Sequence, residues 1–444
     1  MPFTTPLARV LSVALLTTAC SSEAPTPTPG NRNAPASAPA FPPSRLKFDV
    51  GTIPTATPQA DPSVPEHLRE RLADAKSVGM PLHSFQTVQR FYEQREYRPA
   101  WTVSRRISAV GVDALRGLGR LPIHGLDPAD YGTQALAPRG PEPDDAVAFD
   151  MLLTDAWLTA AVHLRQGRLL PADPRAQWSA DGRADDLISV LETALADGNP
   201  QETLLAQAPP HREYAVRVEA LAAVYERAKK DAVPPPEVMI ESLTADLERL
   251  RWLPRELGPR HVRVDQGAGQ LTLHDGAKTT LTMPVAMSRR CAVIETTIDA
   301  IKAVELNPRS DALGSIVLHA SEGLDLHGAL ADAPFSASDP VREGCLRLER
   351  PQALAEALVP TPAWTPEALA EALTKGESLT IALTTQVPLY VTRTTVILEG
   401  STPVLRDGAQ AHNAAVLKAL RSGRPAPILR LPEVEGKPKP KHPD

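Results

Sequence analysis

The sequence has few cysteines. Among its 444 residues only Cys20, Cys291 and Cys345 are cysteine. An odd, sparse set is not the framework of a small disulfide-stabilised domain, and it lacks the paired spacing of a cysteine-rich zinc site. Phosphate-binding glycine loops and His/Asp/Glu clusters with metal spacing are missing as well. We therefore expect no metal and no cofactor, and each cysteine needs its own explanation.

The sequence also lacks a basic stripe. Its 47 lysines and arginines stand against 53 acidic residues, for a net charge of −6, so nucleic acid is not an expected partner. Its content of hydrophobic residues (42%) and charged residues (23%) is ordinary for a globular protein. After the first twenty residues we identify no run long and apolar enough to span a membrane, which takes about 20 residues.

The first twenty residues resemble a secretory signal. Arg9 precedes a short apolar run, Val10–Leu16, which suits a signal peptide and not a membrane span. The run ends in Leu16-Thr-Thr-Ala-Cys20, which resembles a bacterial lipoprotein processing site with Cys20 as the lipidated residue. The alternative is an ordinary signal peptide with an incidental cysteine. We expect export to the periplasm or cell envelope, with membrane anchoring through Cys20.

Composition divides the rest of the chain into four segments. Residues 21–65 are rich in Pro, Ala, Ser and Thr, which predicts a disordered, extended tether. Residues 66–236 show helical periodicity, and residues 237–430 favour strands with short helices. A Pro/Lys-rich tail, 431–444, is expected to be disordered. The predicted fold class is multidomain α+β, with an all-α domain followed by a mostly-β domain.

Periodicity and turn signals place the individual elements. Helices are predicted at 147–166, 212–230, 237–250, 351–359 and 365–375. The predicted strands are 261–265, 270–274, 279–285, 314–320, 324–327, 378–383 and 388–398. Asp275-Gly276 predicts a hairpin turn between the second and third of these strands.

Two short motifs in the mostly-β part carry chemistry, His327-Gly328 and Arg342-Glu-Gly-Cys-Leu-Arg347. A thiol attacks as thiolate, and its ordinary pKa of about 8.5 means that it needs a nearby base. It also needs backbone donors for the oxyanion, which Gly344 helps to aim by allowing a sharp turn beside Cys345. Without further information, a core cysteine and a surface histidine are the commoner explanation.

These motifs resemble those of the L,D-transpeptidases, which use one cysteine to cross-link peptidoglycan. His327-Gly328 and Gly344-Cys345-Leu-Arg347 match the histidine and cysteine motifs of that family. Leu247–Gly258 resembles the lead-in to the catalytic domain of its large multidomain subgroup. Further matches to the helical scaffold domain of that subgroup are Phe91–Trp101, His124–Tyr131, Gly167-Arg168 and Trp178.

The resemblance implies acyl transfer without a cofactor. Cys345, deprotonated by His327, would attack a diaminopimelate carbonyl in a donor stem peptide of peptidoglycan and expel D-alanine. An amine would then resolve the thioester. Gly344 would contribute to the oxyanion site, and Gly328 and Arg347 would contact substrate. For Arg347, a structural salt bridge is an equally supported role.

One motif position departs from the family. Arg342-Glu343 stand where the family has Ser-His. The carboxylate of Glu343 would disfavour a neighbouring thiolate and raise the pKa of Cys345. Alternatively, Glu343 would orient His327, as the acidic member of a triad does, or the site would be inactive.

Other departures leave a second function open. The stretch 284–313 is shorter than the substrate lid of the family, and the small peptidoglycan-binding module usual in the subgroup is missing. The shortened lid and Glu343 favour a catalytically impaired envelope protein that binds peptidoglycan or a partner enzyme, whereas retention of both His327 and Cys345 argues against it. A cysteine peptidase is a third option. His319 is expected to be structural, and Cys291 is expected to be buried.

Overall fold

The computed structural model describes most of the chain after the predicted tether. The described residues are 63–73, 82–137, 145–169, 184–287, 296–320, 324–328, 335, 345–359, 362–400 and 402–422. All of them belong to one structural unit, Phe41–Asp444. The predicted signal, the predicted tether up to residue 62 and the tail lie outside the described residues, as do Cys20, Cys291, Arg342, Glu343 and Gly344. The last residues of the predicted tether, 63–65, instead begin a helix.

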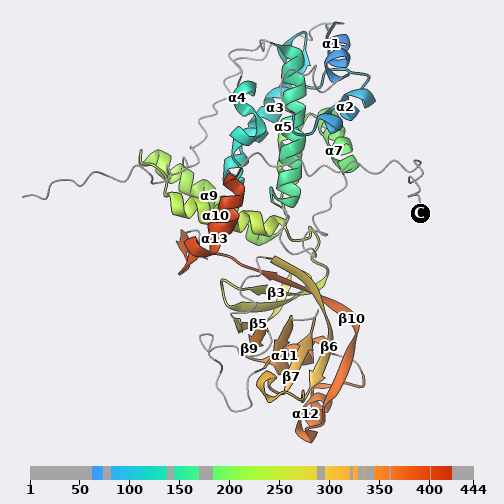
Figure 1. Cartoon of the computed structure of the whole chain (residues 1–444), viewed down its shortest axis with the longest axis vertical. Helices are drawn as coiled ribbons and strands as arrows, with labels where there is room; N and C mark the ends of the chain where they lie inside the picture. Colours follow the sequence, from blue (N-terminus) through green and yellow to red (C-terminus); the bar gives the residue numbers. More distant parts are fainter. Residues whose placement is uncertain are drawn as a thin grey trace, which may run out of the picture. The chain divides into compact units, whose positions relative to one another are not determined.

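A helical region precedes a mostly-β region, as predicted (Figure 1). Its α-helices are α1 (Ser63–Leu72), α2 (Phe85–Gln94), α3 (Ala109–Gly119), α4 (Thr133–Leu136), α5 (Ala146–Gln166), α7 (Ala184–Asp197), α8 (Pro200–Leu205), α9 (Arg212–Lys230) and α10 (Glu237–Arg251). Two 3-10 helices, η1 (Leu121–His124) and η2 (Pro128–Tyr131), lie between α3 and α4. The region is not purely helical, because β1 (Thr102–Val103) and β2 (Arg106–Ile107) form a small hairpin.

Helix α5 is the centre of the helical region. It is long and apolar enough to cross a membrane, contrary to the expectation that no such run follows the signal. However, its most apolar window is 94% buried inside the protein, and α1, α2, α3, α4, α7 and α8 all pack around it. These contacts identify α5 as a core helix of the helical region.

Buried Asp150 in α5 explains the aromatic motif at 91–101. One oxygen of its carboxylate accepts hydrogen bonds from the backbone N–H groups of Ala100 and Trp101, at 2.6 and 3.0 Å. The Tyr92 hydroxyl donates to the same oxygen at 3.2 Å. Both aromatic side chains are fully buried. Because a buried carboxylate needs several donors, these residues form one interdependent unit.

The mostly-β region is built on a closed barrel of eight strands, in the order β10-β3-β4-β5-β9-β8-β7-β6. The strands are β3 (Arg260–Asp265), β4 (Gln270–Asp275), β5 (Lys278–Met287), β6 (Thr296–Leu306), β7 (Ile316–His319), β8 (Asp325–His327), β9 (Leu346–Leu348) and β10 (Leu379–Thr392). Two neighbouring pairs, β10–β3 and β8–β9, are parallel, and the other pairs are antiparallel. Closure leaves the barrel without free edges.

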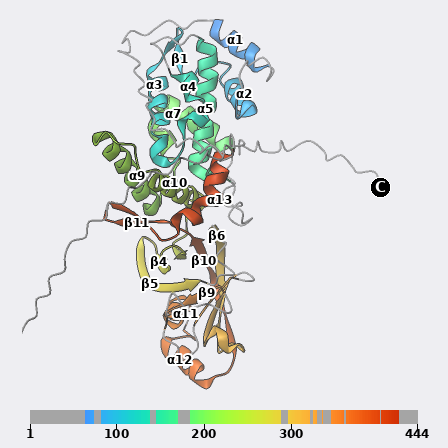
Figure 2. The same ribbon diagram turned by 60° about the vertical axis from the view of Figure 1, so that its left-hand side comes forward.

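Helices and a hairpin accompany the barrel. They are η3 (Asp311–Leu313), α11 (Pro351–Leu358), α12 (Pro366–Lys375), β11 (Val396–Glu399), β12 (Thr402–Leu405) and α13 (Ala409–Arg421). Helix α11 packs against β7, and Figure 2 shows α10 beside both α9 and α13. The predicted hairpin turn is confirmed, since Gly276 has a positive φ of 58° in the two-residue link between β4 and β5.

Several strand predictions were wrong. Strand β6, which lies within the stretch 284–313 and pairs with both β10 and β7, was not predicted. Strand β10 is continuous where two strands were predicted, and it shifts register between Ala382 and Val387. Strands β9 and β12 and helix α13 were not predicted, and the predicted strand 388–398 is divided between β10 and β11. Most of these elements are too short to show a period, so the pairing partner decides their structure.

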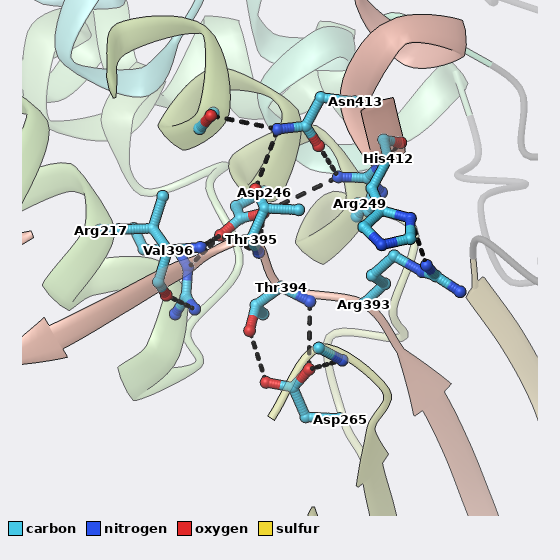
Figure 3. A network of polar contacts seen from close by, with 12 residues as sticks. Arg217, Asp246, Arg249, Asp265, Arg393, Thr394, Thr395, Val396, His412 and Asn413 are labelled. Atoms are coloured by element: carbon cyan, nitrogen blue, oxygen red, sulfur yellow. Dashed lines mark hydrogen bonds and ion pairs between the residues drawn. The ribbon is translucent and has the colours of Figure 1, made fainter. Parts of the chain in front are cut away.

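A buried polar network joins α10 to the segment that follows β10 (Figure 3). The carboxylate of Asp246, fully buried, accepts from Thr395 N at 2.8 Å, from Thr395 Oγ1 at 2.8 Å and from Val396 N at 3.1 Å. It also pairs with Arg217 Nε of α9 at 3.2 Å. Arg249 Nη1, 3.7 Å from Asp246, donates to Asn413 Oδ1 of α13 at 2.7 Å.

A second ion pair of α10 connects it to the helical region. Glu248 and Arg251 are fully buried, with their charged atoms 2.8 Å apart. Arg251 also donates to the His124 carbonyl and, at 3.1 Å, to the Tyr214 hydroxyl. Glu248 accepts from Leu169 N at 2.7 Å. Within α10, the pair Glu248–Arg251 therefore contacts the rest of the helical region. The pair Asp246–Arg249 contacts the segment that follows β10.

Two glycines make this close approach possible. A Cβ on Gly125 (φ 68°) would lie 3.0 Å from Thr244 Cα, and a Cβ on Gly167 (φ 91°) would lie 2.7 Å from Glu248 Oε1. Both positive φ values also favour glycine. The glycines of two motifs that carried the family resemblance are thus required by the packing of α10.

The first prediction concerns the charge of Asp246. Asp246→Asn keeps the shape but leaves Arg217 and Arg249 buried without their counter-charge, so we expect the free energy of unfolding to fall by about 3 kcal/mol. Urea unfolding followed by circular dichroism measures this change. Glu371→Gln, which breaks the solvent-exposed pair with Lys375, is the control and should change nothing measurable. Equal stability of the two variants would contradict the assigned role of Asp246.

The second prediction concerns acid stability. Burial, together with nearby Arg251, lowers the pKa of His124 from 6.5 to about 3. The unfolded chain therefore binds a proton that the folded chain does not, and stability falls as the pH drops below about 6.5. For this residue the loss between pH 7 and pH 5 is about 2 kcal/mol.

Urea unfolding of the protein and of His124→Asn at both pH values measures this contribution. The variant should lose stability overall, because His124 Nδ1 contacts the Tyr214 hydroxyl at 3.0 Å, but should show a weaker pH dependence. An unchanged pH dependence in the variant would assign the acid sensitivity to other groups.

Candidate functional site

His327 ends strand β8 with a defined ring orientation. It is 1% exposed, and its Nδ1 lies 2.7 Å from the Gly328 carbonyl oxygen. Because a carbonyl only accepts, Nδ1 carries the proton. In the neutral ring, Nε2 then holds the lone pair, as a general base requires.

The barrel brings the cysteine motif beside this histidine. Strands β8 and β9 pair in parallel, with Leu326 opposite Leu346 and His327 opposite Arg347. Cys345 directly precedes β9, so it lies two residue steps from the level of His327. With strands about 4.8 Å apart and a rise of about 3.3 Å per residue, their Cα atoms are roughly 8 Å apart. The sequence motifs, 18 residues apart, are therefore spatial neighbours.

Cys345 itself is not a free thiol in this structure. It is disulfide-bonded, 3% exposed, and belongs to the hydrophobic core of the barrel. The other cysteines of the chain, Cys20 and Cys291, both lie outside the described residues. A disulfide sulfur is not a nucleophile toward a carbonyl, so this form of the site is closed to acyl transfer.

Arg347 and Gly328 are also placed at this position of the barrel. The Arg347 guanidinium lies 5.5 Å from the centre of the Phe335 ring, a cation–π distance. A Cβ on Gly328 would lie 3.2 Å from Pro351 Cγ, the first residue of α11. Glycine at 328 therefore allows α11 to pack against the end of β8, next to His327.

Sequence reasoning missed the carboxylates around His319. Its Nε2 lies 2.9 Å from Glu305 Oε2 and its Nδ1 lies 3.1 Å from Asp325 Oδ1. Both ring nitrogens of His319 therefore face a carboxylate oxygen, one on each neighbouring strand. The three residues come from adjacent strands β6, β7 and β8. The sequence does not show which residues of different strands lie side by side, so these carboxylates could not be predicted. The geometry agrees with the structural role expected for His319.

The described residues contain no group of three or more His, Cys, Asp or Glu side chains arranged to hold a metal ion. Glu343 and Gly344 lie outside the described residues, so their assigned roles stay predictions. The described part of the candidate site consists of His327, Gly328, Cys345 and Arg347.

Comparison with known proteins characterises the helical region. A family model described as a Scaffold domain matches residues 86–221, from α2 into α9. No curated protein matches the chain. The matched part is less than a third of the 444 residues and contains none of the candidate site. The helical region thus contains a Scaffold domain, and no catalytic domain is identified by the comparison.

The third prediction tests the structural role of His319. His319→Ala removes the imidazole that contacts both Glu305 and Asp325 on the neighbouring strands. Because all three side chains are partly exposed, we expect a loss of only about 0.5–1 kcal/mol in the free energy of unfolding. Urea unfolding measures it. The control measures the same substitution in the double variant Glu305→Gln/Asp325→Asn. If His319→Ala lowers the free energy of unfolding as much in that variant as in the parent, the pairing with the two carboxylates is not the cause of the loss.

Proposed function

We propose that the protein is a peptidoglycan L,D-transpeptidase, in which reduced Cys345 transfers an acyl group between stem peptides. The observation that carries the proposal is the parallel β8–β9 register, which pairs His327 with Arg347, two residues after Cys345. A separation of roughly 8 Å between the Cα atoms of His327 and Cys345 can be bridged by an imidazole and a thiol that point toward each other. The Scaffold domain at 86–221 also agrees with the resemblance of the chain to this family.

In the proposed mechanism His327 acts first as a base. With the proton on Nδ1 held by the Gly328 carbonyl, Nε2 takes the proton of the Cys345 thiol. The thiolate attacks the carbonyl carbon of diaminopimelate in a donor stem peptide. Backbone N–H groups beside Cys345, with Gly344 allowing the turn, stabilise the oxyanion.

The second half of the reaction restores the site. Collapse of the tetrahedral intermediate breaks the bond to D-alanine, whose amine leaves with the proton from His327. An acceptor amine then attacks the thioester, gives up a proton to His327 and forms the new amide, while the Cys345 sulfur leaves. Atoms and charges balance without a cofactor.

Substrate contacts follow from the same geometry. Arg347 is opposite His327 on β9, where its guanidinium can pair with a substrate carboxylate in bidentate fashion. Gly328 keeps the backbone next to the base free of a side chain. Glu343 is proposed to modulate the site, either by orienting His327 or by disfavouring the thiolate.

The proposed location is the periplasm or cell envelope. A lipid on Cys20 would anchor the protein to a membrane, and the Pro-rich segment 21–65 would span the distance to the wall. Peptidoglycan stem peptides are the proposed partners.

A second candidate function is favoured by the state of the cysteine. Cys345 is disulfide-bonded and 3% exposed, and a carboxylate, Glu343, replaces the motif histidine. Both features suit an impaired, transpeptidase-like envelope protein that binds peptidoglycan or a partner enzyme. Its discriminating property is the absence of acylation even after reduction.

The fourth prediction is acylation of Cys345. Carbapenems are β-lactams that acylate this family, so full-length protein treated with a dithiol reductant and then with a carbapenem should gain one adduct by intact mass spectrometry. Cys345→Ala should gain none. His327→Ala should react about a hundredfold more slowly, because its general base is lost.

His319→Ala is the matched histidine control and should react like the parent. Glu343→His tests the motif departure. An adduct on this variant, with none on the reduced parent, would replace the transpeptidase proposal by the binding function. Equal reaction rates for His327→Ala and His319→Ala would remove His327 from its role as base.

A further inference from the structure

The residue that is disulfide-bonded, Cys345, is the nucleophile of the proposed reaction. We propose that this disulfide is a redox lock, which keeps the protein inactive until a dithiol reductant frees the Cys345 thiol. This inference rests on the proposed function, in which Cys345 is the nucleophile. It adds a regulatory input and a class of partner, a dithiol electron donor in the compartment where the protein acts.

The remainder of the described site is assembled while the sulfur is bonded. His327 has its ring orientation set by the Gly328 carbonyl at 2.7 Å, and the β8–β9 register is in place. Reduction would therefore change the sulfur and leave the base where catalysis needs it. A lock of this kind is reversible, because no strand has to be rebuilt when the bond opens.

The barrel around Cys345 has a large hydrophobic core of its own. Structural disulfides are concentrated in small domains that cannot build a sufficient core. Here the barrel closes on itself with eight strands around an extensive buried hydrophobic core, and the chain has only three cysteines in 444 residues. A regulatory role explains one bond at the proposed nucleophile better than a stabilising role does.

Chemistry also narrows the choice of partner cysteine. Only Cys20 and Cys291 remain in the chain, and lipidation of Cys20 would convert its thiol into a thioether, which cannot form a disulfide. Substitution of each of these two cysteines in turn therefore tests which of them is bonded to Cys345.

Opening of the lock is a two-electron reduction. A thiolate of the dithiol attacks one sulfur of the Cys345 disulfide and forms a mixed disulfide, and the second thiol of the reductant then displaces the remaining cysteine. The dithiol becomes a disulfide, and two protons and two electrons pass to the two protein thiols. Closing needs a disulfide-bearing oxidant and runs the same exchange backwards.

The fifth prediction separates the lock from the activity. Full-length protein is purified without reductant, and free thiols are alkylated with iodoacetamide under native conditions before and after incubation with dithiothreitol. Peptide mass mapping locates the label. We expect no label at Cys345 before reduction and complete labelling after it, and a carbapenem adduct only in the reduced sample.

Variants at the other cysteines identify the lock. Substitution by alanine of the cysteine bonded to Cys345, Cys20 or Cys291, should allow acylation without reductant, whereas substitution of the other should leave the need for reductant unchanged. Urea unfolding of oxidised and reduced protein checks that reduction leaves the fold intact.

Different results overturn different claims. A free Cys345 thiol in the unreduced protein would overturn the lock, as would a bond that dithiothreitol reduces only after denaturation, since that bond would be structural. Cys345 that is alkylated after reduction but never acylated by the carbapenem would leave the switch standing and overturn the proposed transpeptidase activity.

Discussion

The fold depends on the buried charges of α10. Four charged side chains of one helix, Asp246, Glu248, Arg249 and Arg251, are each no more than 1% exposed. Burying such charges is costly unless each has a counter-charge and enough hydrogen bonds. The pair Asp246–Arg249 takes further hydrogen bonds from the segment after β10. The pair Glu248–Arg251 takes further hydrogen bonds from the helical region. The two regions are therefore coupled through one helix.

The coupling extends to the barrel through the end of β10. Asp265, at the end of β3, accepts from Thr394 Oγ1 at 2.5 Å and from Thr394 N at 3.1 Å, and Thr395 is held by Asp246 (Figure 3). Strand β10 lies between β3 and β6 and completes the barrel. The anchor on α10 is thus continuous with the sheet whose β8 and β9 carry the candidate site.

At the candidate site, geometry and chemical state point in different directions. The strand register and the orientation of His327 suit a thiol nucleophile and its base, whereas the disulfide removes the thiol. A redox lock reconciles the two, because it separates the arrangement of the site from its readiness to react. The Scaffold domain at 86–221 is compatible with both the enzyme and the binding protein.

The sequence by itself determined the class of each half, the long helices and the first barrel hairpin, because periodicity and turn residues act over a few positions. It also indicated His327 and Cys345 as a pair, through motifs. Tertiary structure decided β6, β9 and the continuity of β10, since strand pairing joins residues far apart in the chain. It likewise decided that the charges of α10 are buried and that Cys345 is bonded. Neither the spacing of residues along a helix nor the position of one cysteine in the sequence shows which groups a side chain contacts after folding.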